Sequence, residues 1–183
     1  MISDYLSQFV FKTDSNINTN YKVGLAYASY YSKSFEIYNE NRSSSNANNW
    51  SGIASGDFNG DGKNEIVANT NTDGRFFIYE SLNNKMNLLT TSNTLNNSKW
   101  TGITTGDYNL DGKKEFLSIN NNSGNFYIYG YSNNTISQIN KTNFTTNSFE
   151  WINPTSYDFN FDGKEEFVSA NNLDGKIHIY ELK

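Results

Sequence analysis

The chain has 183 residues, a formal net charge of −5, no Cys and one His, His178. This length suits one domain or a row of small units. Without Cys there is no disulfide, thiolate metal site or cysteine nucleophile, and one imidazole leaves little material for catalytic zinc. No apolar run approaches the roughly 18 residues of a spanning helix, so membrane insertion is not expected.

Asn is unusually frequent, with 32 residues, or about 17% of the chain. Disordered chains are usually poor in aromatic residues. Here 13 Tyr and 13 Phe stand with Ile and Val in short blocks between the Asn-rich runs, which indicates ordered strands joined by polar loops. Lys is scattered and Arg occurs only twice, so nucleic-acid binding is not expected.

The chain repeats a unit of about 50 residues. The three Trp residues, Trp50, Trp100 and Trp151, are 50 and 51 residues apart, and the Asp seven positions after each Trp keeps the same spacing. We therefore expect a single domain over residues 1–183. Its repeats are predicted at 4–49 (partial), 50–99, 100–150 and 151–183 (partial).

Each complete copy has the pattern of four strands. In the first copy one strand follows Trp50, and others are predicted at 65–68, 75–79 and 86–90. Consecutive apolar residues at 76–78 indicate a strand that is covered on both faces. Four short strands per repeat are typical of a propeller blade. The prediction is an all-β fold, a β-propeller of four-stranded antiparallel blades.

The first and last repeats are shorter than the others. Residues 4–49 align with strands two to four of a copy, and residues 151–183 end after strand three. About 3.5 blades per chain would leave a sheet edge at each end, and proteins normally cover such edges. We expect self-association of two chains into a seven-bladed ring. The alternatives are a four-bladed ring with incomplete blades and a piece of a longer polypeptide.

One nine-residue loop recurs in every complete copy, at 57–65, 107–115 and 158–166. Oxygen-bearing side chains stand at positions 1, 3, 5 and 9, and Gly stands at position 6. Position 7 is a Lys, and only its main-chain carbonyl is predicted to bind the ion. Ca²⁺ prefers six to eight oxygen ligands, so three structural Ca²⁺ sites are predicted. The predicted ligands are Asp57, Asn59, Asp61, Lys63, Glu65, Asp107, Asn109, Asp111, Lys113, Glu115, Asp158, Asn160, Asp162, Lys164 and Glu166.

Two alternatives compete with this interpretation of the loops. An EF-hand needs a Glu at position 12 and flanking helices, whereas position 12 here is Ala68, Ser118 or Ser169, inside a predicted strand. The other alternative is an Asp/Asn/Gly turn capped by its own side chains. Three carboxylates in each loop favour a cation instead. Three Ca²⁺ would change the formal charge from −5 to +1, and stability is expected to depend on calcium.

The loops and their flanks resemble the FG-GAP/VCBS repeat family, whose blades carry Gly-Asp-[Phe/Tyr]-Asn-x-Asp-Gly, as at 56–62 and 106–112. The third copy departs by having Tyr157 in place of the first Gly. The resemblance is strong over 50–183 and weak over 4–49. It implies a β-propeller with Ca²⁺ between the first two strands of a blade, as in integrin α-subunit heads and propeller lectins. It also implies an extracellular or cell-surface location, although no signal peptide is seen.

The first functional hypothesis is a non-catalytic, lectin-like module that binds carbohydrate and acts in adhesion. Trp50, Trp100 and Trp151 could stack on sugar rings, although packing between blades is the alternative for them. The second hypothesis is a structural or protein-docking module in a larger assembly, so the expected ligand is a glycan or a protein. No enzyme is expected, because His178 stands alone and the spare carboxylates show no pairing.

Overall fold

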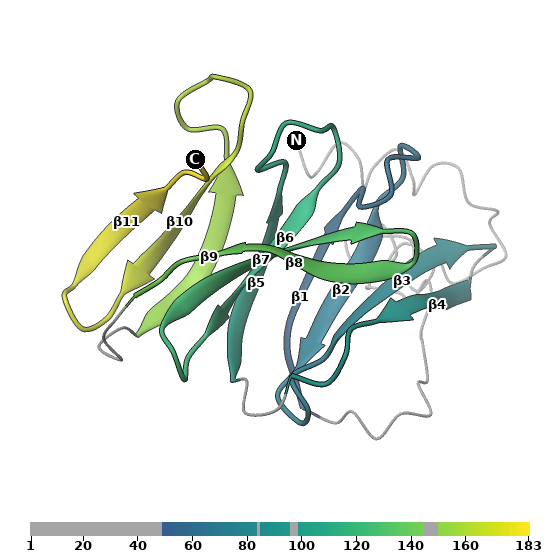
Figure 1. The fold of residues 1–183 in the computed structure, drawn as a ribbon, viewed down its shortest axis with the longest axis horizontal. Helices are drawn as coiled ribbons and strands as arrows, with labels where there is room; N and C mark the ends of the chain where they lie inside the picture. Colours follow the sequence, from purple (N-terminus) through teal and green to yellow (C-terminus); the bar gives the residue numbers. More distant parts are fainter. Residues whose placement is uncertain (1–48, 84, 96–98, 145–149) are drawn as a thin grey trace, which may run out of the picture. The chain divides into compact units, whose positions relative to one another are not determined.

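A computed structural model describes residues 49–83, 85–95, 99–144 and 150–183. In this part of the chain there are eleven β-strands and no helix (Figure 1). The chain divides into two compact units, Met1–Tyr38 and Asn39–Lys183, and all the described residues belong to the second. The predicted partial repeat at 4–49 lies outside the described residues, apart from its last residue.

The strands form three antiparallel sheets, which we call blades 1, 2 and 3. Blade 1 contains β1 (Trp50–Gly56), β2 (Glu65–Thr70), β3 (Phe76–Leu82) and β4 (Lys85–Thr91). Blade 2 contains β5 (Trp100–Gly106), β6 (Glu115–Asn120), β7 (Asn125–Ser132) and β8 (Thr135–Lys141). Blade 3 contains β9 (Trp151–Tyr157), β10 (Glu166–Asn171) and β11 (Lys176–Tyr180). Strands that follow one another in the chain are neighbours in the sheet, which confirms the predicted all-β fold.

Each blade has two faces that the strand register defines. Opposed residues of antiparallel strands share a face. Ile66 pairs with Tyr79 on what we call the front face, and Val67 pairs with Ile78 on the back face. Blades 2 and 3 keep this register, with Phe116 opposite Tyr129 and Phe167 opposite Tyr180 on their front faces.

The back face of one blade packs against the front face of the next. Between blades 1 and 2 the buried cluster contains Phe58, Phe76 and Ile78 from the back face, together with Trp100 and Phe116 from the front face. A second cluster, built from the corresponding positions, lies between blades 2 and 3. Because β3 is covered on both sides, residues 76, 77 and 78 are 0%, 2% and 0% exposed, which confirms the prediction for this strand.

The Trp residues that open blades 2 and 3 belong to these packed interfaces. Trp100 and Trp151 are both 1% exposed. The indole N–H of Trp100 donates a hydrogen bond to the carbonyl of Gly74 at 2.8 Å, and Trp151 packs against Phe126, with ring centroids 5.0 Å apart. Neither indole has a face for a ligand. This corrects the prediction that these two residues bind sugar, because packing between blades uses both rings.

Candidate metal centre and docking faces

The candidate metal centre is the nine-residue loop between the first two strands of each blade. The carboxylate at position 1 accepts a hydrogen bond from the backbone N–H of the Gly at position 6, at 2.8, 3.0 and 2.9 Å in the three loops. This Gly has a φ of 83°, 84° or 94°, in the region where a side chain would be strained. The repeated Gly therefore allows the chain to wrap around the first carboxylate.

Positions 3 and 5 turn the loop in the same way in all three copies. The Asn at position 3 accepts from the N–H of position 5 at 2.7 to 2.9 Å. The Asp at position 5 accepts from the N–H of position 7 at 2.9 Å. These bonds are typical of turns capped by Asx side chains, so both interpretations of the sequence expect them. The second oxygen and remaining lone pairs of these groups can still act as acceptors.

The Glu at position 9 braces the loop from inside the blade. Glu65, Glu115 and Glu166 are 3%, 3% and 4% exposed. In each loop one oxygen accepts the N–H of position 2 at 2.9 to 3.0 Å, and the other accepts the Asn amide of position 3 at 3.0 to 3.1 Å. The sequence showed an acidic residue here, and the structure adds this bracing contact.

In the first two loops the protein environment disfavours the negative charge on the position-9 Glu. Burial raises the pKa of Glu115 to about 7. The negative charges of Asp111 and Asp107 also raise this pKa, whereas the hydrogen bond from the Tyr108 N–H lowers it. Burial and neighbouring carboxylates raise the pKa of Glu65 as well. A nearby cation would relieve this repulsion.

Loop 107–115 offers a direct test of whether a cation fits. Asp107 Oδ1 is buried and has no hydrogen-bond partner, and such a carboxylate oxygen is costly without a compensating charge or donor. No group of three or more His, Asp or Glu side chains converges among the described residues. A site would therefore also need Asn109 and the main-chain carbonyl of Lys113, which Ca²⁺ accepts. The oxygen-only donor set fits a hard divalent cation.

The repeated loop and blade define the class of protein. The chain matches the FG-GAP-like repeat over residues 57–118 and 107–169, so each match runs from one loop into the second strand of the next blade. These matches span more than half of the chain, and the chain belongs to the FG-GAP repeat family. No curated protein matches it. The family generally contains non-enzymatic binding or structural modules and is typically extracellular or on surfaces.

Two further findings bear on location and chemistry. In the described ranges no helix has the length and apolar character needed to cross a membrane. The imidazole Nε2 of His178 lies 3.0 Å from a carboxylate oxygen of Asp174, and its ring contacts the edge of Trp151 at a centroid distance of 5.0 Å. These contacts place His178 beside the packed interface between blades 2 and 3.

The back face of blade 3 is the first candidate docking face. Ile177 holds the register position of Phe76 and Phe126, yet it is 75% exposed where they are 0% and 1% exposed. Ile179 and Phe159 are 57% and 41% exposed, whereas their counterparts in blades 1 and 2 are at most 4% exposed. The apolar back face is therefore buried in blades 1 and 2 and exposed in blade 3. Sequence reasoning missed these residues, although the change from Phe to Ile at position 177 and the change from Gly to Tyr at position 157 were visible signals.

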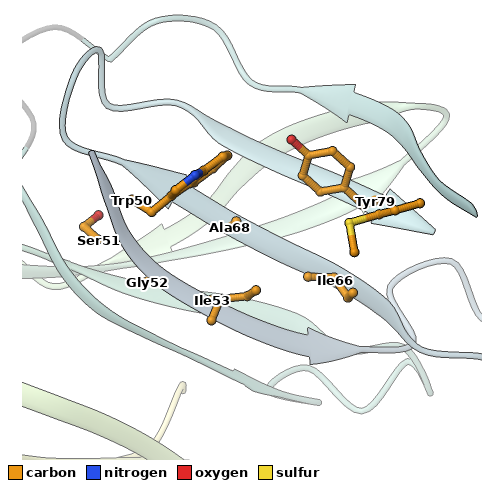
Figure 2. Close-up of a pocket in the computed structure, with 8 residues that line it drawn as sticks. Trp50, Ser51, Gly52, Ile53, Ile66, Ala68 and Tyr79 are labelled. Carbon is orange, nitrogen blue, oxygen red and sulfur yellow. The ribbon is translucent and has the colours of Figure 1, made fainter. Parts of the chain in front are cut away.

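The β1 edge of the front face of blade 1 is the second candidate docking face, because Phe77 and Tyr79 of β3 on the same face are only 2% and 4% exposed. Trp50 is 47% exposed and Ile53 is 70% exposed, whereas Trp100, at the same position in blade 2, is 1% exposed. Figure 2 shows their side chains around a hollow of about 470 Å³. The residues that line it are Trp50, Ser51, Gly52, Ile53, Ile66, Ala68, Tyr79 and Met86. The structure thus brings Trp50, alone of the three predicted Trp residues, to a hollow surface.

Proposed function

We propose that the chain is a calcium-stabilised, non-catalytic module that docks onto a protein surface. The observation that carries this function is the back face of blade 3, where Ile177, Ile179 and Phe159 expose positions that the other blades bury. Exposed contiguous apolar surface of this kind marks interaction sites. The structural or docking hypothesis therefore takes precedence over the carbohydrate hypothesis.

The calcium part of the proposal rests on the loops. Bound Ca²⁺ would supply a fixed positive charge to oxygens of positions 1, 3 and 5, to the carbonyl of position 7 and to the Glu of position 9. The buried oxygen of Asp107 supports this assignment, as does the raised pKa of Glu115. The role of the ion is structural, because the loop joins the first two strands of each blade.

Calcium titration tests the metal sites. Isothermal titration calorimetry on protein stripped of metal should give three sites per chain, and Ca²⁺ at 100 times its Kd should stabilise the fold by about 2.7 kcal/mol for each site. The variant Asp107→Asn should reduce the stoichiometry from three to two. Asp73→Asn is the matched control, because Asp73 lies in the turn before β3 and outside the loops, and should retain three sites.

A different result would remove the metal from the proposal. If verified metal-free protein melts at the same temperature with and without added Ca²⁺, the loops are turns capped by their own side chains. The docking function would survive that result, since it rests on blade 3. Mg²⁺ provides a comparison, because it demands near-octahedral geometry and retains water, and we expect it to stabilise the protein less.

Carbohydrate binding is the second candidate function, and Trp50 favours it. Its exposed ring could stack on a sugar face, as in many aromatic binding surfaces. Against this, the only side-chain hydroxyls among the lining residues are those of Ser51 and Tyr79, whereas sugars need several hydrogen bonds. A glycan array distinguishes the two candidates: binding that is lost in Trp50→Ala and retained in Leu173→Ala would establish a lectin.

We also propose an extracellular or cell-surface location. The support is the family and the expected calcium sites, because extracellular modules bind Ca²⁺ with dissociation constants of about 10⁻⁴ to 10⁻³ M. Calorimetry gives this constant directly. A Kd in the submicromolar range would instead suit a compartment with little free calcium.

A further inference from the structure

We infer that the three loops are coupled, so that calcium bound in one loop raises the calcium affinity of the loop in the neighbouring blade. The inference rests on the metal sites of the proposed function and adds how these sites act on one another. The loops at 57–65, 107–115 and 158–166 are called loops 1, 2 and 3.

A backbone hydrogen bond links each loop to the next. The N–H at position 8 of one loop donates to the main-chain carbonyl at position 1 of the preceding loop. Lys114 donates to Asp57 at 2.8 Å, and Glu165 donates to Asp107 at 3.1 Å. Loop 2 is therefore bonded to loop 1 through its own position 8 and to loop 3 through its own position 1.

The peptide unit that makes this link also belongs to the predicted ion site. The carbonyl of position 7 and the N–H of position 8 are the two ends of one peptide unit, which is planar. In loop 2 this unit joins Lys113, whose carbonyl is a predicted ligand, to Lys114, whose N–H is bonded to Asp57. A carbonyl held by an ion in loop 2 therefore fixes the direction of the N–H that holds loop 1.

The residue that accepts the link is itself a predicted ligand. Asp57 accepts the N–H of Lys114 through its main-chain carbonyl, and its carboxylate accepts the N–H of Gly62 at 2.8 Å. Asp107 has the same two roles in loop 2. Ordering one loop thus also holds the first ligand of its neighbour. The neighbour then loses less conformational entropy when it binds its own ion, which is a source of positive coupling.

Side chains add a second contact between neighbouring loops. A Cβ at Gly60, position 4 of loop 1, would lie 3.2 Å from the Cε of Lys113 in loop 2. A Cβ at Gly163, position 6 of loop 3, would lie 3.9 Å from the Cδ2 of Leu110 in loop 2. Loop 2 therefore touches both of its neighbours with side chains of its own turn.

Charge acts against this coupling, because two cations in neighbouring loops repel each other. Salt separates the two effects. The Debye length is about 8 Å at physiological ionic strength and shorter at higher salt, so added salt weakens the repulsion between exposed sites. Direct hydrogen bonds between the loops are not screened in this way. We therefore expect the coupling to persist or to increase as the salt concentration rises.

Two variants distinguish coupling between neighbours from a response of the whole chain. Asp158→Asn should empty loop 3 and leave loops 1 and 2, which are neighbours. Asp107→Asn should empty loop 2 and leave loops 1 and 3, which are not. Each variant loses one position-1 carboxylate and retains the main-chain carbonyl, so the two are matched controls. If a loop still binds calcium, Asp162→Asn or Asp111→Asn is added to the respective variant.

Isothermal titration calorimetry of the full chain, stripped of metal and titrated with Ca²⁺, measures the coupling. After statistical correction, Asp158→Asn should bind its second ion about fivefold or more tightly than its first. Asp107→Asn should bind two ions with equal constants. Repeating both titrations at higher ionic strength should leave this contrast in place.

Amide hydrogen exchange, followed by NMR on calcium-loaded protein, reports on the links themselves. In Asp107→Asn the Lys114 N–H should exchange faster than in the wild type, although loop 1 is still filled. In Asp158→Asn the Glu165 N–H should exchange faster, and the Lys114 N–H should keep its wild-type rate. This measurement does not require the metal-free chain to fold.

Two calorimetric outcomes would overturn the inference: equal constants in Asp158→Asn, or the same cooperativity in both variants. Far-UV circular dichroism shows whether the metal-free chain retains its strands. If it does not, hydrogen exchange decides, and an unchanged Lys114 rate in Asp107→Asn overturns the coupling. A wild-type chain that binds no Ca²⁺ is a different result, because it removes the proposed metal sites and the coupling with them.

Discussion

Blade 2 and blade 3 share a strand register but differ in what covers their back faces. Phe126 in blade 2 is 1% exposed, whereas Ile177, at the same position of blade 3, is 75% exposed. The alternation of apolar residues is similar in both blades, so it cannot tell which back face has a neighbour. The difference teaches that burial in this repeat depends on the next blade, as in other quasi-one-dimensional folds.

Truncating the two equivalent side chains should give the largest contrast. Phe126→Ala should lower the free energy of unfolding by about 3–5 kcal/mol, because it leaves a cavity among Phe144, Trp151 and Phe167. Ile177→Ala should change it by less than about 0.5 kcal/mol in the monomer. Urea unfolding at a concentration where the chain is monomeric measures both values. Equal losses would show that Ile177 is buried within a single chain.

Replacing a glycine at the covered face with alanine should have a smaller effect on stability. In Gly106→Ala the new Cβ would lie 2.7 Å from the Tyr108 ring and 2.8 Å from Glu165, so we expect a loss of about 1–3 kcal/mol. Tyr157→Ala, at the same position of blade 3, should change stability by less than about 0.5 kcal/mol. Thermal melts in saturating calcium make the comparison. An unchanged melting temperature in Gly106→Ala would mean that the two blades pack more loosely than their contacts indicate.

The ion pair between blades 2 and 3 should have the smallest effect. Lys114 and Glu165 form a salt bridge, and their side chains are 37% and 21% exposed. Such partly exposed pairs contribute about 0.2–1 kcal/mol, and salt screens them. The variant Glu165→Gln should therefore lower stability slightly at low ionic strength and almost not at all at high ionic strength. A double-mutant cycle with Lys114→Met isolates the pair, and an effect independent of salt would point to packing instead.

Much of the fold and of the loops could be predicted from the sequence because both depend on short-range chemistry. The strands after each Trp, the apolar run at 76–78 and the loop glycines are set by local period and by turn geometry. The bracing role of Glu65 could not be predicted, since its hydrogen-bond donors, the Phe58 N–H and the Asn59 amide, are placed only once β2 is paired with β1. The roles of the Trp residues also stayed open, because an aromatic residue can pack or bind and its neighbours decide which.

The sequence by itself determined a triplicated all-β unit with one oxygen-rich loop in each copy, because strand period, turn residues and spacing are properties of neighbouring residues. Only the tertiary structure decided which apolar faces are covered. It buried Trp100 and Trp151 between blades, and it left Trp50 and Ile177 at the surface. The physical reason is that burial requires a second surface, and equivalent faces differ in exposure according to the blade that lies next to them.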